Sequence, residues 1–205
     1  MADSRHDTLS WRALMIGFWL LVVSARASAE VRWVDTERST VRMHLSLSSP
    51  WSGEGAGPVL EAPLAEGSLE DTESPHLALV INVGARRGVA PGLSPERRQI
   101  LQEKIFGPDG LDAERFSRIT YHSLTIEQLG AGVWIVRGEL EMRGRFLPLN
   151  IRTVRRGDQF TGTTTVHPSD FGIVPIPIAG NSRVLGQNVR VDFHVVLELS
   201  DQDIP

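Results

Sequence analysis

Three residues that could do hydrolytic chemistry stand close together in the C-terminal part of the chain: His167, Ser169 and Asp170. A serine hydrolase needs a histidine that bridges the nucleophile and an acid. These three residues are too close in sequence for that relay, and the chain has no Gly-x-Ser-x-Gly nucleophile elbow. We therefore predict no catalytic site and no enzyme, and we expect Asp170 to shape a turn through its own backbone.

Histidines are the other residues that could do chemistry, as metal ligands. None of those beyond residue 29 has the helical spacing to a second histidine or a carboxylate that metal sites use. The chain has no cysteine, so zinc thiolates, thiol nucleophiles and disulfides are excluded. Imidazoles on neighbouring strands could still meet at about 5 Å, but we favour surface histidines and predict no metal site. The five histidines are His44, His76, His122, His167 and His194.

The first 29 residues form a distinct segment. Arg12 precedes an uncharged apolar run over residues 13–25, and Ala27-Ser28-Ala29 follows as a small-x-small cleavage pattern. This pattern predicts a secretory signal peptide over residues 1–29, cleaved near Ala29, and a periplasmic or secreted domain over residues 30–205. The alternative is an uncleaved membrane anchor over residues 13–25, although a span normally needs about 20 residues.

The charge balance gives no sign of a nucleic-acid partner. The whole chain carries a net charge of −4; without residues 1–29 it has 18 basic and 23 acidic residues, a net charge of −5. A mildly acidic protein offers no electrostatic footprint for phosphate backbones. The basic pairs at 86–87 and 97–98 could support only transient contact with a membrane, because each charge contributes about 1 kcal/mol near an anionic leaflet.

Apolar residues alternate with polar ones through most of residues 30–199. Successive side chains of a strand point to opposite faces, so these runs predict half-buried antiparallel strands. Short glycine-containing links separate the runs between 118 and 167, which predicts a four-stranded meander. Pro148 lies inside one of these strands and must therefore occupy an edge, a bulge or a strand start. The alternating runs begin near Val41, Leu77, Trp134, Leu147 and Val189.

One helix is expected to interrupt the strands. Ser94 can cap it, Pro95 suits its first turn, and Gly107 ends it. Its apolar stripe is Ile100, Leu101 and Ile105. Two segments read as irregular: residues 50–58 as a Gly-rich loop, and residues 172–186 as a segment lying across an opening.

These elements predict an all-β fold, one closed antiparallel barrel with an inserted helix. A barrel of about eight strands can either fill with side chains or hold one small ligand. Gly138 and Gly162 on the dry faces add no bulk, and this composition could leave room inside. The pattern alone supports a hollow barrel and a solid core equally.

Four segments resemble motifs of the YceI-like family. Residues 116–123 are similar to its Phe-x-x-Ile-Thr-Phe-x-Ser strand, and residues 136–149 to its Val-x-Gly-x-Leu hairpin with a following proline. Residues 169–173 match Ser-Asp-Phe-Gly-Ile, and residues 34–41 resemble Ile-Asp-x-x-x-Ser-x-Val. The resemblance covers about residues 31–199. It implies an extended eight-stranded, lipocalin-like barrel and an exported, non-enzymatic protein that holds a polyisoprenoid-type molecule.

The chain also resembles one branch of this family, which has the helix and an Ala-Pro-(apolar)-Ala-x-Gly segment, here residues 62–67. Branch members usually carry a His-x-His pair just before that segment. This chain has Gly55-Ala56-Gly57-Pro58 there, so a role assigned to that pair does not transfer.

Together these patterns predict a carrier that binds or sequesters an apolar or amphiphilic lipid, isoprenoid-type or quinone-like, with no other cofactor. The alternative is a filled barrel that acts as a structural or interaction protein of the cell envelope. The predicted ligand-binding residues are those on the dry faces: Val41, Met43, Leu45, Leu79, Ile81, Tyr121, Trp134, Val136, Leu140, Phe160, Val191, Phe193 and Val195.

Overall fold

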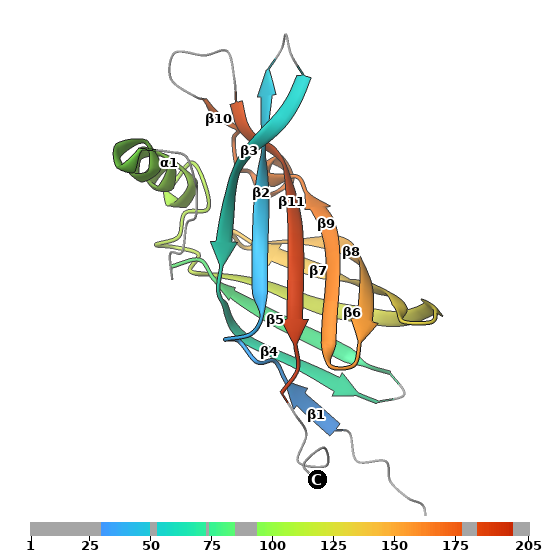
Figure 1. Ribbon diagram of the computed structural model, residues 1–205. Helices are drawn as coiled ribbons and strands as arrows, with labels where there is room; N and C mark the ends of the chain where they lie inside the picture. The colour runs from blue at the N-terminus through green and yellow to red at the C-terminus, as the bar shows by residue number, and fades with distance from the viewer. Residues whose placement is uncertain (1–29, 50–52, 73, 85–93, 178–183, 199–205) are drawn as a thin grey trace, which may run out of the picture.

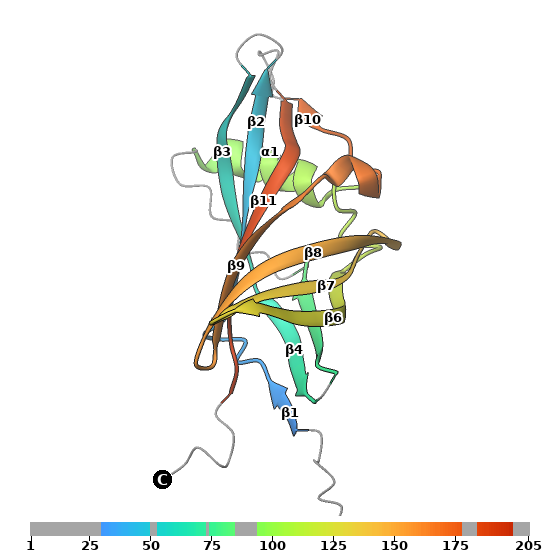
Figure 2. The ribbon, with the colours of Figure 1, turned by 90° about the vertical axis from the view of Figure 1, so that its right-hand side faces the viewer.

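The computed structural model describes residues 30–49, 53–72, 74–84, 94–177 and 184–198. The predicted signal peptide and the alternative anchor lie outside these residues. Figure 1 and Figure 2 show one antiparallel sheet that curls around an interior, with a single long helix against its upper part. The predicted all-β class with one inserted helix is therefore confirmed.

The sheet runs in the neighbour order β1-β4-β5-β6-β7-β8-β9-β11-β2-β3, and β10 lies beside β11. Every described pair of neighbours is antiparallel, and the predicted meander over 118–167 is β6 to β9. The strands are β1 (Glu30–Trp33), β2 (Thr40–Ser49), β3 (Gly53–Ala62), β4 (Leu64–Asp71), β5 (His76–Asn82), β6 (Arg118–Gly130), β7 (Val133–Met142), β8 (Arg145–Arg156), β9 (Gln159–Val166), β10 (Ile176–Pro177) and β11 (Val184–Val196).

The described residues form eleven strands rather than the predicted eight. Only Pro63 separates β3 from β4, and these two halves pair with different neighbours, β2 and β5. They act as one long strand bent at a residue that cannot donate a ladder hydrogen bond. The short strands β1 and β10 account for the rest of the difference, and eight long strands remain.

Two segments predicted to be irregular are partly strand. The Gly-rich loop predicted over 50–58 was wrong for residues 53–58, which belong to β3 and pair with β2; residues 50–52 lie outside the described part. The pairing of a full strand on one side outweighs the low strand propensity of glycine. In the segment 172–186, residues 176–177 form β10 and residues 184–186 begin β11, and these two pieces pair with each other.

A short seam links β4 to the segment after β11, two parts of the sheet that are not neighbours in the strand order. The backbone N–H of Val34 donates to the carbonyl of Gly67 on β4 (2.9 Å), and Val34 forms an isolated antiparallel bridge with Leu197 after β11. The N–H of Glu198 donates to the carbonyl of Trp33 (2.8 Å). The segment around residue 34 therefore links β4 to the end of β11, which closes the lower end of the barrel in Figure 1.

The turn that follows the seam is held by two polar side chains. Asp35 Oδ1 accepts from the backbone N–H groups of Glu37 and Arg38 (3.1 and 3.0 Å), which fixes the turn between β1 and β2. The buried Ser39 Oγ accepts from the N–H of Val196 (2.9 Å). The Asp-x-x-x-Ser motif thus attaches the first turn to β11.

The sheet opens between β8 and β9 at its other end. The β8–β9 ladder covers only Arg152 to Arg156, and the two strands diverge beyond it, as Figure 2 shows. Pro148 lies in the part of β8 that pairs with β7 alone, so the predicted edge position is confirmed. The Thr164 hydroxyl on β9 bridges the gap to the carbonyl of Asn150 (3.4 Å).

The predicted helix is α1 (Pro95–Phe106), and its cap is also as predicted, with Ser94 Oγ accepting from the N–H of Arg97 (3.4 Å). The apolar stripe is only partly correct. Ile105 is buried against Leu45 and Leu60, whereas Ile100 is 53% exposed. Leu101 is partly buried against the same cluster, so two of the three predicted stripe residues pack on the barrel. Among the described residues, no helix has the length and apolar character needed to span a membrane.

The seam gives a first prediction. A Cβ at Gly67 would lie 2.7 Å from Val34 Cγ2, so Gly67→Ala should force Val34 away from the seam. Overpacking of this kind costs about 1–3 kcal/mol, and urea unfolding should show that loss. Gly130→Ala is the matched control, because a Cβ there meets nothing within 4 Å. Equal stability of the two variants would contradict the proposed importance of this contact.

Candidate functional site

The barrel encloses an apolar cavity of about 440 Å³. That volume is within the range of about 300–1,000 Å³ typical of small-molecule sites. The structure brings all the predicted ligand-binding residues together on the wall of this one cavity, although their contact with a ligand stays a prediction. They are Val41, Met43, Leu45, Leu79, Ile81, Tyr121, Trp134, Val136, Leu140, Phe160, Val191, Phe193 and Val195.

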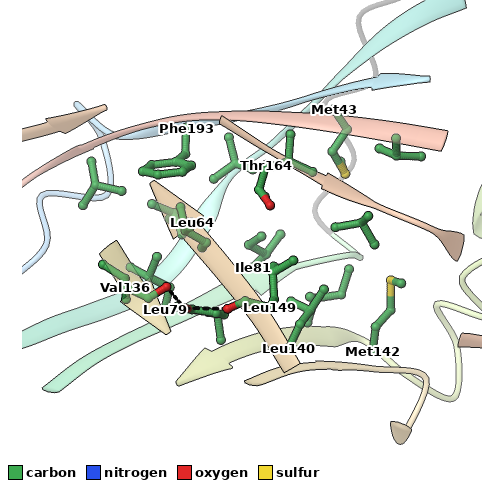
Figure 3. A pocket seen from close by; sticks show the side chains of 18 of the residues that line it. Met43, Leu64, Leu79, Ile81, Val136, Leu140, Met142, Leu149, Thr164 and Phe193 are labelled. Carbon is green, nitrogen blue, oxygen red and sulfur yellow. Dashed lines mark hydrogen bonds between the residues drawn. The ribbon is translucent and has the colours of Figure 1, made fainter. Parts of the chain in front are cut away.

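The side chains enter the cavity from opposite walls of the curled sheet. In Figure 3, Met43, Thr164 and Phe193 project from β2, β9 and β11, and Leu79 and Leu140 face them from β5 and β7. Alternation along each strand delivers every second residue to this interior. The sequence could therefore identify these residues without knowing which strands would be neighbours.

Further residues of the long strands, such as Leu60, Ile119 and Ile151, also line the cavity but were not among the predicted site residues. Residues from outside the long strands, equally absent from the prediction, complete the wall. The end of α1 and the loop after it contribute Ile105 and Leu111, and the segment after β9 contributes Pro168, Ile173, Val174 and Ile176. Period-two alternation cannot identify irregular segments of this kind. The one available signal was that residues 172–186 combine apolar residues with prolines, and its first part does lie at the cavity.

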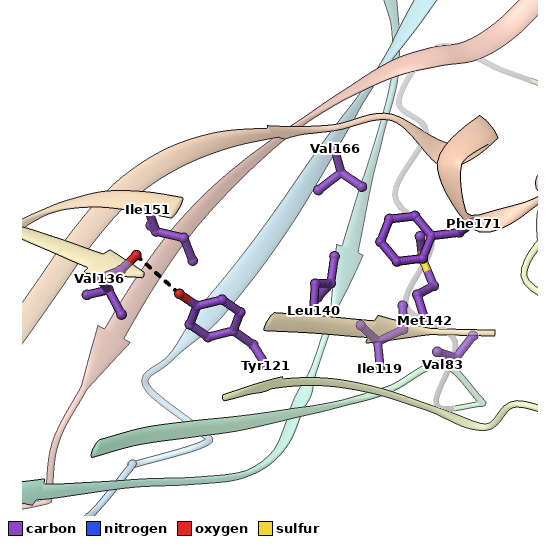
Figure 4. Packing of buried hydrophobic residues seen from close by; sticks show 9 residues of the cluster. All are labelled: Val83, Ile119, Tyr121, Val136, Leu140, Met142, Ile151, Val166 and Phe171. Atoms are coloured by element: carbon purple, nitrogen blue, oxygen red, sulfur yellow. Dashed lines mark hydrogen bonds between the residues drawn. The ribbon is translucent and has the colours of Figure 1, made fainter. Parts of the chain in front are cut away.

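Tyr121 is one of the deeply buried polar side chains of this apolar wall. It is 5% exposed, and its hydroxyl lies 3.2 Å from the carbonyl oxygens of both Val136 and Leu149. These carbonyls belong to β7 and β8, so the hydroxyl proton ties β6 to the next two strands of the meander. The dashed line in Figure 4 marks the bond between the Tyr121 hydroxyl and Val136. Burial raises the pKa of Tyr121, which keeps the side chain neutral.

The two interior glycines do not leave empty space, contrary to the expectation from their size. A Cβ at Gly138 would lie 2.7 Å from the Tyr121 hydroxyl oxygen and 2.2 Å from the carbonyl oxygen of His122. At Gly162 it would lie 2.4 Å from the ring of Phe193. Each glycine lets the tip of an aromatic ring from a neighbouring strand approach the backbone closely. The cavity is therefore bounded by these rings and does not extend into the glycine positions.

A small apolar cluster covers the interior where β8 and β9 diverge. Figure 4 shows Val166 and Phe171 opposite Leu140 and Met142. Phe171 belongs to a short 3-10 helix, η1 (Pro168–Phe171), which ends at Gly172 with a φ of 75°. Glycine is the residue that adopts this left-handed conformation without strain.

Two arginines hold η1 against the β7–β8 turn. Arg143 donates to the carbonyls of Gly172 (2.9 Å) and Pro108 (3.1 Å), and Arg145 donates to the carbonyl of Asp170 (2.9 Å). Arg143 and Gly144 both have positive φ, as a two-residue type I′ hairpin turn requires. The hydrogen bonds of Arg143 offset the strain of its own left-handed backbone and hold η1 in place over the cavity.

The residues that suggested hydrolysis do not converge. His167 Nδ1 lies 2.8 Å from Asn188 Oδ1, and Ser169 and Asp170 are exposed around η1. The backbone N–H of Asp170 donates to the carbonyl of His167 (3.0 Å), so this residue takes part in a turn through its backbone, as expected.

The histidines are dispersed as well. His44 Nε2 lies 2.8 Å from Asp192 Oδ2 on the outer face, at ion-pair distance but without the alignment of a hydrogen bond. Burial acts to raise the pKa of Asp192, but the hydrogen bond from Thr163 and the charges of Arg190 and His44 outweigh it and lower that pKa. Within the described ranges, no group of three histidine or acidic side chains is placed to hold a metal ion.

Comparisons with known proteins agree with this architecture. The sequence model of a family described as "YceI-like domain" matches residues 33–197. A UPF0312 protein of Shewanella sp. (strain W3-18-1) is 34% identical over 79 residues, and one of Shewanella baltica (strain OS155) is 36% identical over the same length. Each alignment covers 34% of this chain and only 41% of the relative.

Among solved structures, the crystal structure of Burkholderia cenocepacia BcnA is similar, with a TM-score of 0.58. The likeness covers 80% of this chain and 98% of that chain at 17% sequence identity. At that identity the similarity concerns the fold alone.

Tyr121 gives a prediction about alkaline stability. Because its pKa is raised in the folded protein, the unfolded chain loses this proton first, near pH 10. The contribution of Tyr121 to the free energy of unfolding should therefore be fully present below about pH 10 and should fall as the pH rises further. Tyr121 is the only tyrosine in the chain, so tyrosinate absorbance reports on it alone.

We expect tyrosinate to appear only together with unfolding. Tyr121→Phe should lose about 1 kcal/mol at neutral pH through the missing hydrogen bonds, and it should lack the alkaline decline in stability that this tyrosine causes. Tyrosinate formation near pH 10 in a protein that stays folded would contradict the burial described here.

Proposed function

The chain belongs to the YceI-like family, and from this premise we propose that it binds or sequesters an apolar or amphiphilic lipid inside its barrel. Known members of this family hold polyisoprenoid-type molecules, so an isoprenoid lipid, polyprenyl or quinone-like, is the proposed ligand class. The role is binding rather than catalysis.

The cavity is the observation that carries this proposal. Of the described residues on its wall, all but five are apolar or glycine; the exceptions are Thr72, Tyr121, Thr153, Arg155 and Thr164. An extended apolar molecule placed there would gain about 0.8 kcal/mol for each methylene removed from water. Binding costs reduce this gain, so affinity should depend on how fully a chain fills the cavity. A barrel that served only as a structural or interaction module would need no such space.

The first test introduces a charge into the cavity wall. Leu140→Glu puts a carboxylate on the interior face of β7, and lipid binding would then strip it of water at a cost of several kcal/mol. We expect its affinity for geranylgeraniol to fall at least about 100-fold in calorimetric titration. Leu124→Glu is the matched control, because Leu124 on β6 is 60% exposed and does not line the cavity.

A second variant covers the case in which Leu140→Glu does not fold. Val191→Trp keeps the interior apolar and occupies part of the cavity, so it should also weaken binding of the same lipid. A folded Leu140→Glu or Val191→Trp protein that binds geranylgeraniol as tightly as the unaltered chain would overturn the assignment of the cavity.

Export is part of the proposal and rests on the sequence of residues 1–29. We expect the protein to occur in the periplasm or outside the cell with Glu30 as its first residue. N-terminal peptide mapping by mass spectrometry of the protein from its native cells identifies its first residue directly. Protein that is found in a membrane fraction with residues 13–25 still attached would contradict cleavage and support the alternative of a membrane anchor.

A further inference from the structure

Arg155 stands out among the cavity residues because it is charged. It follows Ile151 and Thr153 at every second position of β8, so it lies on the interior face of that strand. It is the one charged residue among the described residues that line the cavity. Burying charge beside apolar surface is unfavourable unless a partner of opposite charge is supplied.

The contacts of Arg155 orient its guanidinium group without neutralising it. Its Nε donates to the carbonyl oxygen of Gly157 (3.1 Å), and its Cζ lies 5.2 Å from the centroid of the Phe160 ring. Both contacts come from the β8–β9 turn or the strand that follows it. A carbonyl and an aromatic face hold the group in place but leave its full positive charge.

The nearest acidic residue of this turn is already engaged. Asp158 forms an ion pair with Arg32 on β1, with 2.9 Å between Asp158 Oδ1 and Arg32 Nη2. Across the described parts of the chain, no carboxylate lies within ion-pair distance of Arg155. The charge is therefore available to a ligand.

A shallow, open depression with a mostly polar lining adjoins the apolar cavity at this position. It has a volume of about 350 Å³, and Trp134 and Arg155 line both spaces. The other residues around it are Gln128, Gly132, Gly157 and Asp158. Arg155 thus stands between an apolar space and a polar one, the arrangement that an amphiphile with a charged end requires.

The far end of the cavity suits the other end of such a molecule. Arg145 begins β8 and contacts η1, and Arg155 lies ten residues further along the same strand, which corresponds to about 30 Å. Near η1 the wall is formed by apolar residues such as Ile173 and Val174, and Val174 is 67% exposed. A long apolar tail that extends from Arg155 would run along β8 toward that end.

We propose that Arg155 binds the anionic headgroup, a monophosphate or a carboxylate, of the lipid whose apolar chain occupies the barrel. This inference rests on the proposed lipid-binding function and specifies the ligand's polar end and its orientation. A guanidinium group is suited to both anions, because its planar fork can donate two parallel hydrogen bonds to two oxygens.

The test compares lipids that differ only in the headgroup. Geranylgeraniol, geranylgeranyl monophosphate and geranylgeranoic acid are titrated into the unaltered protein and into Arg155→Leu. The unaltered protein should bind at least one anionic lipid about 10- to 100-fold more tightly than the alcohol. Arg155→Leu should lose that preference and bind the alcohol at least as well as before. A preference shared by both anions supports a general anion site, and a preference for one of them names the headgroup.

Arg156→Leu is the matched control, because it removes the same charge from the neighbouring, exposed position on the outer face of β8. It should keep the preference for the anionic lipid. An equal loss in both variants would overturn the inference in favour of a general charge effect. Equal affinity of the unaltered protein for all three lipids would overturn it while the lipid-binding function stands. Binding of none of them would overturn both.

Discussion

The seam around Val34 is the constraint on which the barrel depends. A curled sheet keeps an apolar interior only if it closes on itself. Here the bent strand β3–β4 belongs to both ends of the sheet, and a few backbone hydrogen bonds through Val34 link β4 to the end of β11. Gly67 allows the close approach, and Asp35 and Ser39 hold the adjoining turn. This contact joins segments that are far apart in sequence. Its loss would separate β4 from the end of β11 and expose the apolar faces of both strands to water.

The motifs shared with the YceI-like family are therefore packing devices in this chain. Gly138, in the Val-x-Gly-x-Leu hairpin, makes room for the Tyr121 ring, and Gly172 ends η1 in a conformation suited to glycine. Phe171 covers the gap between β8 and β9. None of these roles is catalytic. They shape the wall around a space that side chains do not fill.

All 13 residues predicted from the sequence lie on the cavity wall, because strand alternation decides which side chains face inward, but they are only 13 of the 38 described residues that line it. The dry-face residues, such as Leu79 and Phe193, all line the cavity. The bend at Pro63 could not be predicted, because local pattern does not reveal that β3 and β4 pair with different neighbours. The contribution of η1 was missed because it has no periodicity. Arg155 was not selected since charge is ordinarily a mark of the outer face, and only the adjoining depression shows its position between two spaces.

The most direct test of whether the barrel holds a lipid is native mass spectrometry of the protein purified from its own cells, followed by organic extraction. An apolar cavity of this kind should retain its lipid through purification, because release must expose the apolar chain to water. We expect an additional bound mass that extraction identifies as an isoprenoid-type lipid. A protein that shows only its own mass, and still shows only that mass after incubation with isoprenoid alcohols, phosphates and quinones, would contradict this expectation.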